Sequence, residues 1–282
     1  MSPLVSVVVP VFNGLPHLTQ LVDSILAQTH EYLDVVFVDG GSSDNSLTFL
    51  RSVTDPRVRV LTNPTATGAG ANWDAASESA RGEFVKLVCQ DDLLYPEAIA
   101  KQVADLSRSP TAVMAIAQRD IVDARGSVVY RNRGCAGLRP GVVDGSDAIK
   151  VAYLRGTNVF GEPVTVLFRR QSLMNALSWD DSNPFLLDLT LYAKVARTGD
   201  VVVRKESIGA FRVSTQSWST RLVGEQVRQF RTWQESFAAS LPAQPGLRDR
   251  GRAFMGLHTQ ALLRRGAYRW LRIKGSLESH SV

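Results

Sequence analysis

Short apolar runs alternate with segments of helical periodicity over the first 120 residues. The runs are of strand length and rich in β-branched residues, and they occupy residues 5–9, 34–38, 58–61, 84–89 and 112–117. Between them, apolar residues recur at helical spacing in segments 15–28, 44–51, 68–80 and 94–106. Strands and helices that alternate through short connections predict an α/β fold with a mainly parallel sheet and helices on both of its faces.

The pattern loosens after residue 120. Gly126 lies between two β-prone runs and predicts a hairpin, and the Gly- and Arg-rich segment 131–145 is expected to be a loop. Residues 222 onward are again helical in character. We therefore expect an α/β domain over residues 1–220, with halves that meet near residue 120, and a helical C-terminal extension over residues 221–282.

Composition narrows the class of protein. Of 282 residues, 44% are hydrophobic and 21% are charged, as in soluble globular proteins. The two cysteines, Cys89 and Cys135, exclude a disulfide scaffold and favour the reducing cytosol. No run approaches the roughly 18 apolar residues that span a bilayer, and the opening Met-Ser-Pro-Leu lacks the positive region of a signal peptide. We expect a cytoplasmic protein.

The charge is unevenly placed. Residues 221–282 carry eleven Lys and Arg against four Asp and Glu, whereas residues 1–220 carry 21 against 23. This distribution argues against a nucleic-acid partner for the α/β domain. In the tail, Leu263, Ala267, Trp270 and Lys274 share one helical face, and Arg265, Arg269 and Arg272 share another. Such a helix either contacts an anionic membrane through residues 252–274 or packs on the domain with its basic face in solvent.

Polar residues follow several of the predicted strands. In open α/β sheets ligands bind beyond the carboxyl ends of the strands, so residues 10–13, 39–43 and 90–92 are the informative places. Asp39 precedes two glycines, and its carboxylate can accept a hydrogen bond from a nucleotide base or a ribose hydroxyl. An ordinary helix cap is the alternative.

Three further positions are candidates for chemistry. The adjacent carboxylates of Asp91 and Asp92 suit Mg²⁺ or Mn²⁺ held jointly with phosphate oxygens; alternatively, Asp92 caps a helix that begins near Leu94. Asp188 has apolar neighbours that would raise its pKa and make it a general base; the alternative is a cap or a salt bridge. Segment 68–72 lacks the third glycine of a dinucleotide fingerprint, although Asn72 could reach a nucleotide.

Taken in order along residues 4–218, several segments resemble family 2 glycosyltransferases of the GT-A fold. Three resemble the family's nucleotide-binding opening, and the others resemble its metal-motif strand, its acceptor-side strand and its catalytic-base helix. In the same order, they are residues 5–13, 23–29, 38–44, 81–96, 161–170 and 188–199. The resemblance implies an inverting transfer of a hexosyl or deoxyhexosyl group from a nucleoside-diphosphate sugar to an acceptor hydroxyl.

The resemblance also implies roles for individual residues. Asp91 would hold Mn²⁺ or Mg²⁺ against the diphosphate with the support of Asp92, and Asp188 would deprotonate the acceptor hydroxyl. Residues 212–218 would form a loop that closes over both substrates. The other implied site residues are Pro10, Phe12, Asn13, Asp39, Asn72 and Gln90 on the nucleotide-sugar side, and Glu162, Arg212 and Trp218 on the acceptor side.

The chain departs from the family pattern at two positions. Cys89 stands where the family often has an acidic residue two positions before the metal aspartate, which leaves more of the metal binding to Asp91 and Asp92. Leu187 stands where an acidic residue often precedes the base, and this apolar neighbour should raise the pKa of Asp188.

Two other functions remain open. A sugar nucleotidyltransferase would need a glycine-rich, cation-bearing loop after the first strand, where this chain reads Pro-Val-Phe-Asn-Gly over residues 10–14. A binding protein without transfer activity would hold the nucleotide sugar and leave it intact. The expected acceptor is a glycan, a glycolipid or a lipid-linked sugar, as in bacterial cell-surface assembly. The sugar, the base, the linkage and the oligomeric state stay open.

Overall fold

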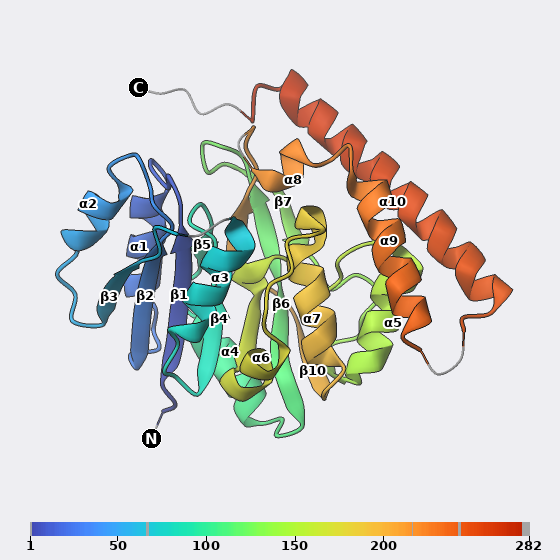
Figure 1. Cartoon of the computed structure of the whole chain (residues 1–282), viewed down its shortest axis with the longest axis horizontal. Coiled ribbons are helices and arrows are strands. Elements are labelled where there is room, and N and C mark those ends of the chain that lie inside the picture. Colours follow the sequence, from blue (N-terminus) through green and yellow to red (C-terminus); the bar gives the residue numbers. More distant parts are fainter. Residues whose placement is uncertain (1, 66–67, 216, 242–243, 278–282) are drawn as a thin grey trace.

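The computed structural model describes residues 2–65, 68–215, 217–241 and 244–277. In this part of the chain ten strands form one sheet in the order β3-β2-β1-β4-β9-β6-β10-β5, with β7 beside β6 and β8 beside β10 (Figure 1). The strands that pair in parallel are β1 (Val5–Val11), β2 (Leu33–Asp39), β3 (Val58–Thr62) and β4 (Phe84–Leu87), and separately β6 (Ala112–Val122) with β10 (Asp200–Arg212). The antiparallel strands are β5 (Leu93–Leu94), β7 (Val128–Arg133), β8 (Gly141–Val143) and β9 (Val166–Arg169).

Helices cover both faces of the sheet, as the alternating pattern predicts. In β1, Val7 and Val9 contribute to one apolar core, whereas Val8 contributes to the other. Successive side chains of a strand point to opposite faces, so a strand buried on both faces is apolar throughout. One core includes α1 (Leu18–Leu26), α2 (Ser46–Arg51) and α4 (Ala98–Ser107); the other includes α3 (Ala69–Glu78), α5 (Gly145–Arg155), α6 (Arg170–Ala176) and α7 (Leu187–Ala196).

The C-terminal helices pack on the second core. They are α9 (Gln226–Ala239) and α10 (Leu247–Ile273), preceded by the short helix α8 (Trp218–Arg221), and α10 is the outermost helix on the side away from β3 (Figure 1). The side chains of Phe230, Trp233 and Leu257 are buried in the same core as α5 and α7. A Cβ on Gly156 would lie 2.4 Å from the backbone of Leu257, so this glycine allows α10 to approach the end of α5. The boundary expected at residue 220 falls inside α8.

Two local predictions are wrong for the same reason. The helix expected over residues 94–106 starts only at Ala98, because Leu93 and Leu94 pair with β10 as strand β5. The loop expected over residues 131–145 contains the end of β7 and all of β8, which pairs with β10. Both strands form against a partner distant in the chain, and short segments of this kind have little local signal. The hairpin at Gly126 is confirmed.

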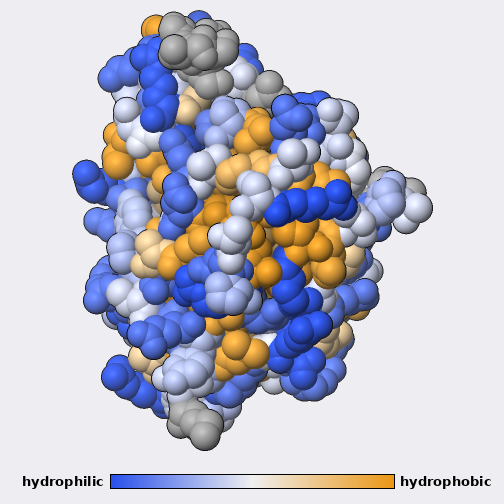
Figure 2. All heavy atoms as spheres, turned by 90° about the vertical axis from the view of Figure 1, so that its left-hand side faces the viewer, coloured by the Kyte–Doolittle hydropathy of each residue, from blue (hydrophilic) through white to orange (hydrophobic). Residues whose placement is uncertain are grey.

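The sheet is open at its β3 end. Leu61 in this edge strand is 39% exposed, and Figure 2, which looks onto this side of the molecule, shows apolar side chains gathered in the middle of the face between hydrophilic ones. Among the residues that the structure describes, none of the helices combines the length and the apolar character that crossing a bilayer requires.

Candidate active site

A cavity of about 1610 Å³ lies beyond the carboxyl ends of the central strands. Residues from the first half of the chain that line it include Phe12, Asn72 and Asp91. Residues from the second half include Asp188 and Arg264. Of the residues that the sequence analysis singled out, the cavity is lined by Pro10, Phe12, Asn13, Asn72, Gln90, Asp91, Glu162 and Asp188, whereas Asp39 and Asp92 do not line it.

The loops after β1 and β2 are joined by their polar side chains. Asn13, at φ +51°, accepts a hydrogen bond from the backbone N–H of Ser43 over 2.8 Å through its Oδ1. Asp39 Oδ2 accepts hydrogen bonds from the N–H groups of Gly41 and Ser42, both over 3.1 Å. The other oxygen, Asp39 Oδ1, is buried and has no partner among the described residues. A buried acceptor without a partner is costly unless a ligand supplies a donor.

The side chains of Gln90 and Asn72 form hydrogen bonds with backbone groups at the carboxyl ends of the neighbouring strands. Gln90 accepts from the N–H of Phe12 over 2.8 Å and donates to its carbonyl over 2.9 Å, which ties the end of β4 to the end of β1. Asn72 reaches from α3 and donates to the carbonyls of Val11 and Val38. These bonds fix the neighbouring strand ends and leave the Phe12 side chain 58% exposed at the cavity, which Pro10 also lines.

The loop after β4 is fixed from behind by Arg212. Asp92 is fully buried and accepts from the backbone N–H of Arg212 over 3.1 Å. The Arg212 guanidinium donates to the carbonyl of Asp91 over 3.0 Å and to Gln20 Oε1 over 2.8 Å. Burial raises the pKa of both Asp91 and Asp92. Only Asp91 of the two lines the cavity.

The position of Arg212 corrects the sequence interpretation, which placed it in an acceptor-side loop. Arg212 is the last residue of β10, is 1% exposed and pairs in register with Val122 of β6. The β-prone run at residues 208–213 agrees with this strand, which pairs with β6 as far as Arg212. Beyond the strand, residues Val213, Ser214, Thr215 and Ser217 line the cavity. Trp218 is the first residue of α8, and its side chain lies outside the described part of the structure.

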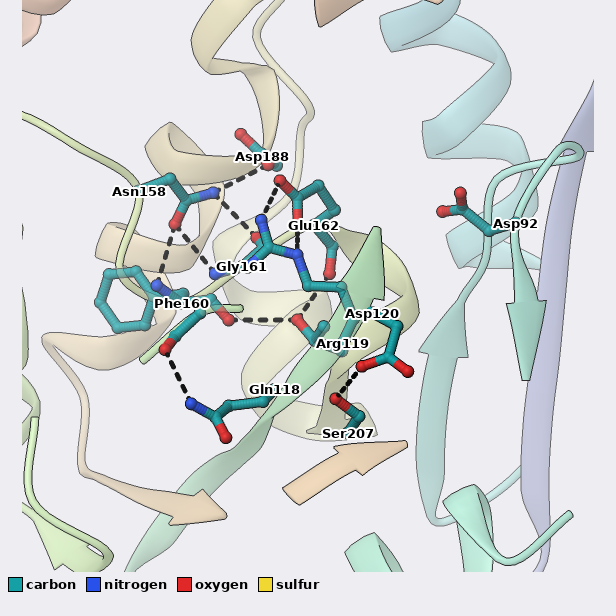
Figure 3. A network of polar contacts seen from close by, with 12 residues as sticks. Asp92, Gln118, Arg119, Asp120, Asn158, Phe160, Gly161, Glu162, Asp188 and Ser207 are labelled. Carbon is teal, nitrogen blue, oxygen red and sulfur yellow. Dashed lines mark hydrogen bonds and ion pairs between the residues drawn. The ribbon is translucent and has the colours of Figure 1, made fainter. Parts of the chain in front are cut away.

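Asp188 is held in one orientation by two hydrogen bonds. It is the second residue of α7, and its Oδ1 accepts from the N–H of Leu189 over 2.6 Å. Its Oδ2 accepts from Asn158 Nδ2 over 2.8 Å, and Asn158 is itself fixed by hydrogen bonds to Gly161 and Phe160 (Figure 3). No salt bridge to Lys194 or Arg197 is present among the described residues.

The surroundings of Asp188 favour its protonated form. Burial, and next the negative charge of Glu162, raise the pKa of Asp188 to about 7. Glu162 precedes the short 3-10 helix Pro163–Thr165 and is paired with Arg119 of β6, whose Nη2 donates to Glu162 Oε1 over 2.6 Å. Leu187 is buried beside Asp188 in the chain, as its apolar character predicts. A carboxyl group with a pKa near 7 is suited to general base catalysis at neutral pH.

Acidic side chains from both halves of the chain affect the Cys89 thiol. Burial and the negative charges of Asp92, Asp91, Asp188 and Glu162 raise its pKa well above the usual value. Figure 3 shows the Asp188 network and Asp92 on separate elements, with the Asp92 carboxylate turned to the side of the network. Cys89 lines the same cavity as Asp91, Asp188 and Glu162, so the negative charges of both halves of the chain act within it.

The donor set of this cavity fits a metal ion only in part. The described residues contain no group of three or more His, Cys, Asp or Glu that could hold a metal ion by themselves. The Asp91 carboxylate faces the cavity without a Lys, Arg or His partner within 4.0 Å among the described residues. A single carboxylate of this kind fits a divalent cation whose other ligands come from a substrate and water.

The sequence analysis missed Asn158, Arg119 and Arg264. Asn158 is 30 residues from Asp188, and Arg264 is farther still, so no spacing rule relates them. The sequence analysis gave no role to Arg119, just after the predicted strand 112–117, or to Asn158, beyond the predicted loop 131–145. Their contacts with the acidic residues exist only after the sheet has formed.

Residues 6–175 match the model of the family described as Glycosyl transferase family 2. The chain belongs to this family. An uncharacterized glycosyltransferase of Rickettsia bellii is 22% identical to this chain over 257 residues, which is 90% of this chain. The alignment covers 36% of that longer protein.

Solved structures agree with the family. The family 2 chain is 18% identical to TarS of S. aureus with a TM-score of 0.66, over 91% of this chain and 72% of TarS 1–349. It is 19% identical to the mannosyltransferase PcManGT of Pyrobaculum calidifontis with a TM-score of 0.60, over 99% and 77% of the two chains. At this identity the likeness concerns the fold, and it confirms the predicted GT-A architecture.

Proposed function

We propose that this protein transfers a glycosyl group from a nucleoside-diphosphate sugar to an acceptor hydroxyl with inversion of the anomeric carbon. The observation that carries the proposal is that Asp91 and Asp188, 97 positions apart, line the same cavity. The structure of TarS has been solved with UDP-GlcNAc, and that of PcManGT with GDP-Man and Mn²⁺. These ligands support a nucleotide sugar as the donor.

The donor is proposed to bind over the first half of the sheet. Asp39 Oδ1 is a buried acceptor without a protein partner, which suits an N–H of the nucleotide base. The exposed ring of Phe12 offers a surface beside it, and Asn13 and Gln90 hold the loops in place.

Asp91 would hold Mn²⁺ or Mg²⁺ together with diphosphate oxygens, while the buried Asp92 supports its loop through Arg212. A divalent cation bound there would neutralise charge on the departing diphosphate.

The acceptor is proposed to approach from the side of α7. As the acceptor oxygen bonds to the anomeric carbon, the bond from that carbon to the diphosphate breaks, and the hydroxyl proton passes to Asp188. Asn158 keeps the Asp188 carboxylate in one orientation, and Glu162 with Arg119 borders this side of the cavity. A single displacement of this kind inverts the configuration.

The C-terminal extension contributes to the same site. The inner face of α10 lines the cavity with Arg264, Ala267, Tyr268 and Leu271, so we propose that the extension shapes the acceptor side of a catalytic domain over residues 1–220.

The outer face of α10 supports the proposed peripheral membrane contact through residues 252–274. Residues 250–277 contain seven Lys and Arg and no Asp or Glu. The large apolar side chains exposed on α10 are Leu247, Phe254, Met255, Leu262, Leu263, Trp270 and Ile273. Apolar and cationic groups on one exposed surface are typical of helices that lie on anionic bilayers. This placement favours a glycolipid or lipid-linked acceptor in cell-surface glycan assembly.

The test is an assay for nucleoside diphosphate release and glycoside formation. Purified protein is incubated with UDP- and GDP-sugars, Mn²⁺ or Mg²⁺ and a panel of glycan and lipid-linked acceptors. The proposal expects a glycoside with inverted anomeric configuration, seen by NMR. Binding of the nucleotide sugar with no product from any acceptor would favour the non-catalytic alternative. Release of pyrophosphate from a nucleoside triphosphate would favour a nucleotidyltransferase.

A further inference from the structure

Arg264 reaches from α10 into the acceptor side of the cavity. Its guanidinium carbon lies 5.0 Å from the centre of the Phe185 ring, three positions before Asp188. Its Nη1 donates to Gln226 Oε1 over 2.8 Å, and its Nη2 donates to Thr157 Oγ1 over 3.4 Å. A guanidinium has five N–H donors, so these two contacts leave part of its capacity for a ligand in the cavity.

The charge of Arg264 has no contact ion pair. Among the described residues, no carboxylate lies within 4.0 Å of it, whereas Arg59, Arg119 and Arg204 each contact a carboxylate. Arg212, which is buried behind the cavity, places its donors on backbone carbonyls and an amide oxygen instead. Burial also lowers the pKa of Arg264, which is half-buried, because a charged group loses solvation where water is partly excluded. A cation in such a place is stabilised by an anion that arrives with a ligand.

We infer that Arg264 forms an oxyanion-binding subsite beside Asp188, and that the acceptor carries a phosphate or carboxylate group near the hydroxyl that is glycosylated. The identification of the bound molecule as the acceptor rests on the proposed function, whereas the presence of an oxyanion-binding subsite does not. The neighbours of Arg264 place the subsite on the acceptor side, because Thr157 adjoins Asn158, and Phe185 precedes the base on the same segment. Guanidinium groups bind phosphate and carboxylate through paired hydrogen bonds.

A competing role for Arg264 is electrostatic. Its positive charge acts on both Glu162 and Asp188, and it lowers the pKa of Asp188. In that case Arg264 would serve the base and not the acceptor. The two roles differ in what the protein binds, so a binding experiment separates them.

The experiment titrates inorganic phosphate into the protein by isothermal calorimetry at constant ionic strength, with and without saturating nucleoside diphosphate and Mg²⁺. The bound nucleotide keeps phosphate out of the donor site. The test variant is Arg264→Gln. The matched control is Arg265→Gln, which removes the same charge from the exposed side of the same helix. Nucleoside diphosphate affinity on the same samples reports whether each variant is folded.

We expect phosphate to bind wild type and Arg265→Gln alike, and Arg264→Gln about tenfold or more weakly, as for the loss of a charge-assisted contact. Equal binding by all three proteins, or no phosphate binding by wild type, would overturn the inference. The inference would also be overturned if Arg264→Gln bound phosphate like wild type and its pH profile of transfer moved to higher pH. That result would show that Arg264 acts electrostatically on Asp188. Phosphate binding that requires Arg264 in a protein without nucleotide affinity would keep the subsite and contradict the proposed function.

Discussion

Asn158 Nδ2 donates a 2.8 Å hydrogen bond to Asp188 Oδ2, and this bond joins the segment before β9 to the first turn of α7. Asn158 is itself immobilised by Phe160 and Gly161, so the carboxylate meets the cavity in a fixed orientation. A general base works only when it is ionised and correctly oriented toward the hydroxyl that it deprotonates. For the proposed base Asp188 the contact bears on both requirements, because the hydrogen bond from Asn158 fixes the carboxylate and also lowers its pKa.

Asp188→Asn should abolish transfer and leave donor binding intact. The amide keeps the size of the side chain but cannot take the acceptor proton, and loss of a general base typically costs about 10²–10⁴ in rate. The measurement is glycoside formation beside nucleoside diphosphate affinity. The control is Asp180→Asn, an exposed carboxylate on the preceding loop. Transfer near the wild-type rate by Asp188→Asn would remove this residue as the base.

Transfer should fall as the pH drops below about 7, where Asp188 becomes protonated. The same pKa predicts a stability effect. The folded state holds a proton between the ordinary pKa of 3.8 and about 7 that the unfolded state has lost, so ionising Asp188 in this window destabilises the fold as the pH rises. Asp188→Asn should therefore melt above wild type at pH 8, with the difference vanishing near pH 4. An equal difference at both pH values would contradict the burial argument.

Asn158→Ala should reduce kcat and move the acid limb of the transfer profile to higher pH. The alanine removes a donor that stabilises the ionised carboxylate and also frees Asp188 to rotate. The measurement is a pH profile of kcat, with Asn175→Ala on the exposed side of α6 as the control. A lower kcat with an unmoved limb would mean that Asn158 only maintains local structure.

Asp91→Asn should remove the effect of divalent cations on nucleotide binding. The substitution leaves the loop in place, because Arg212 holds it through the backbone carbonyl of residue 91. The asparagine amide, however, lacks the negative charge that binds a cation. The measurement is the rise in melting temperature that nucleoside diphosphate causes with and without Mn²⁺. If the rise remains cation-dependent in Asp91→Asn, another group holds the metal.

A Leu262→Glu, Leu263→Glu double variant should lose binding to anionic vesicles at low salt. Both leucines are exposed on α10, at 74% and 61%, so the change places charge where the proposal puts lipid and leaves the core alone. Co-sedimentation with phosphatidylglycerol vesicles is the measurement. Leu61→Glu on the edge strand β3 is the control. Wild-type protein that stays in the supernatant at low salt would contradict the membrane proposal.

The amino-acid sequence alone determined the alternation of strands and helices, because each buried strand and amphipathic helix has a local pattern. It also indicated Asp39 and Asp91, which follow strands that the pattern locates, and it indicated Asp188 through its apolar neighbours and the resemblance to the family's catalytic-base helix. In such a sheet these positions converge beyond the strand ends, as the cavity confirms for Asp91 and Asp188.

Only the tertiary structure decided the remaining parts. β5 and β8 exist through their pairing with β10, and Arg212 is buried because β6 extends that strand to its position. Asn158 and Arg264 acquire their places beside Asp188 through contacts across 30 and 76 positions of the chain. Such contacts depend on packing between distant segments, and a local pattern of residues does not contain them.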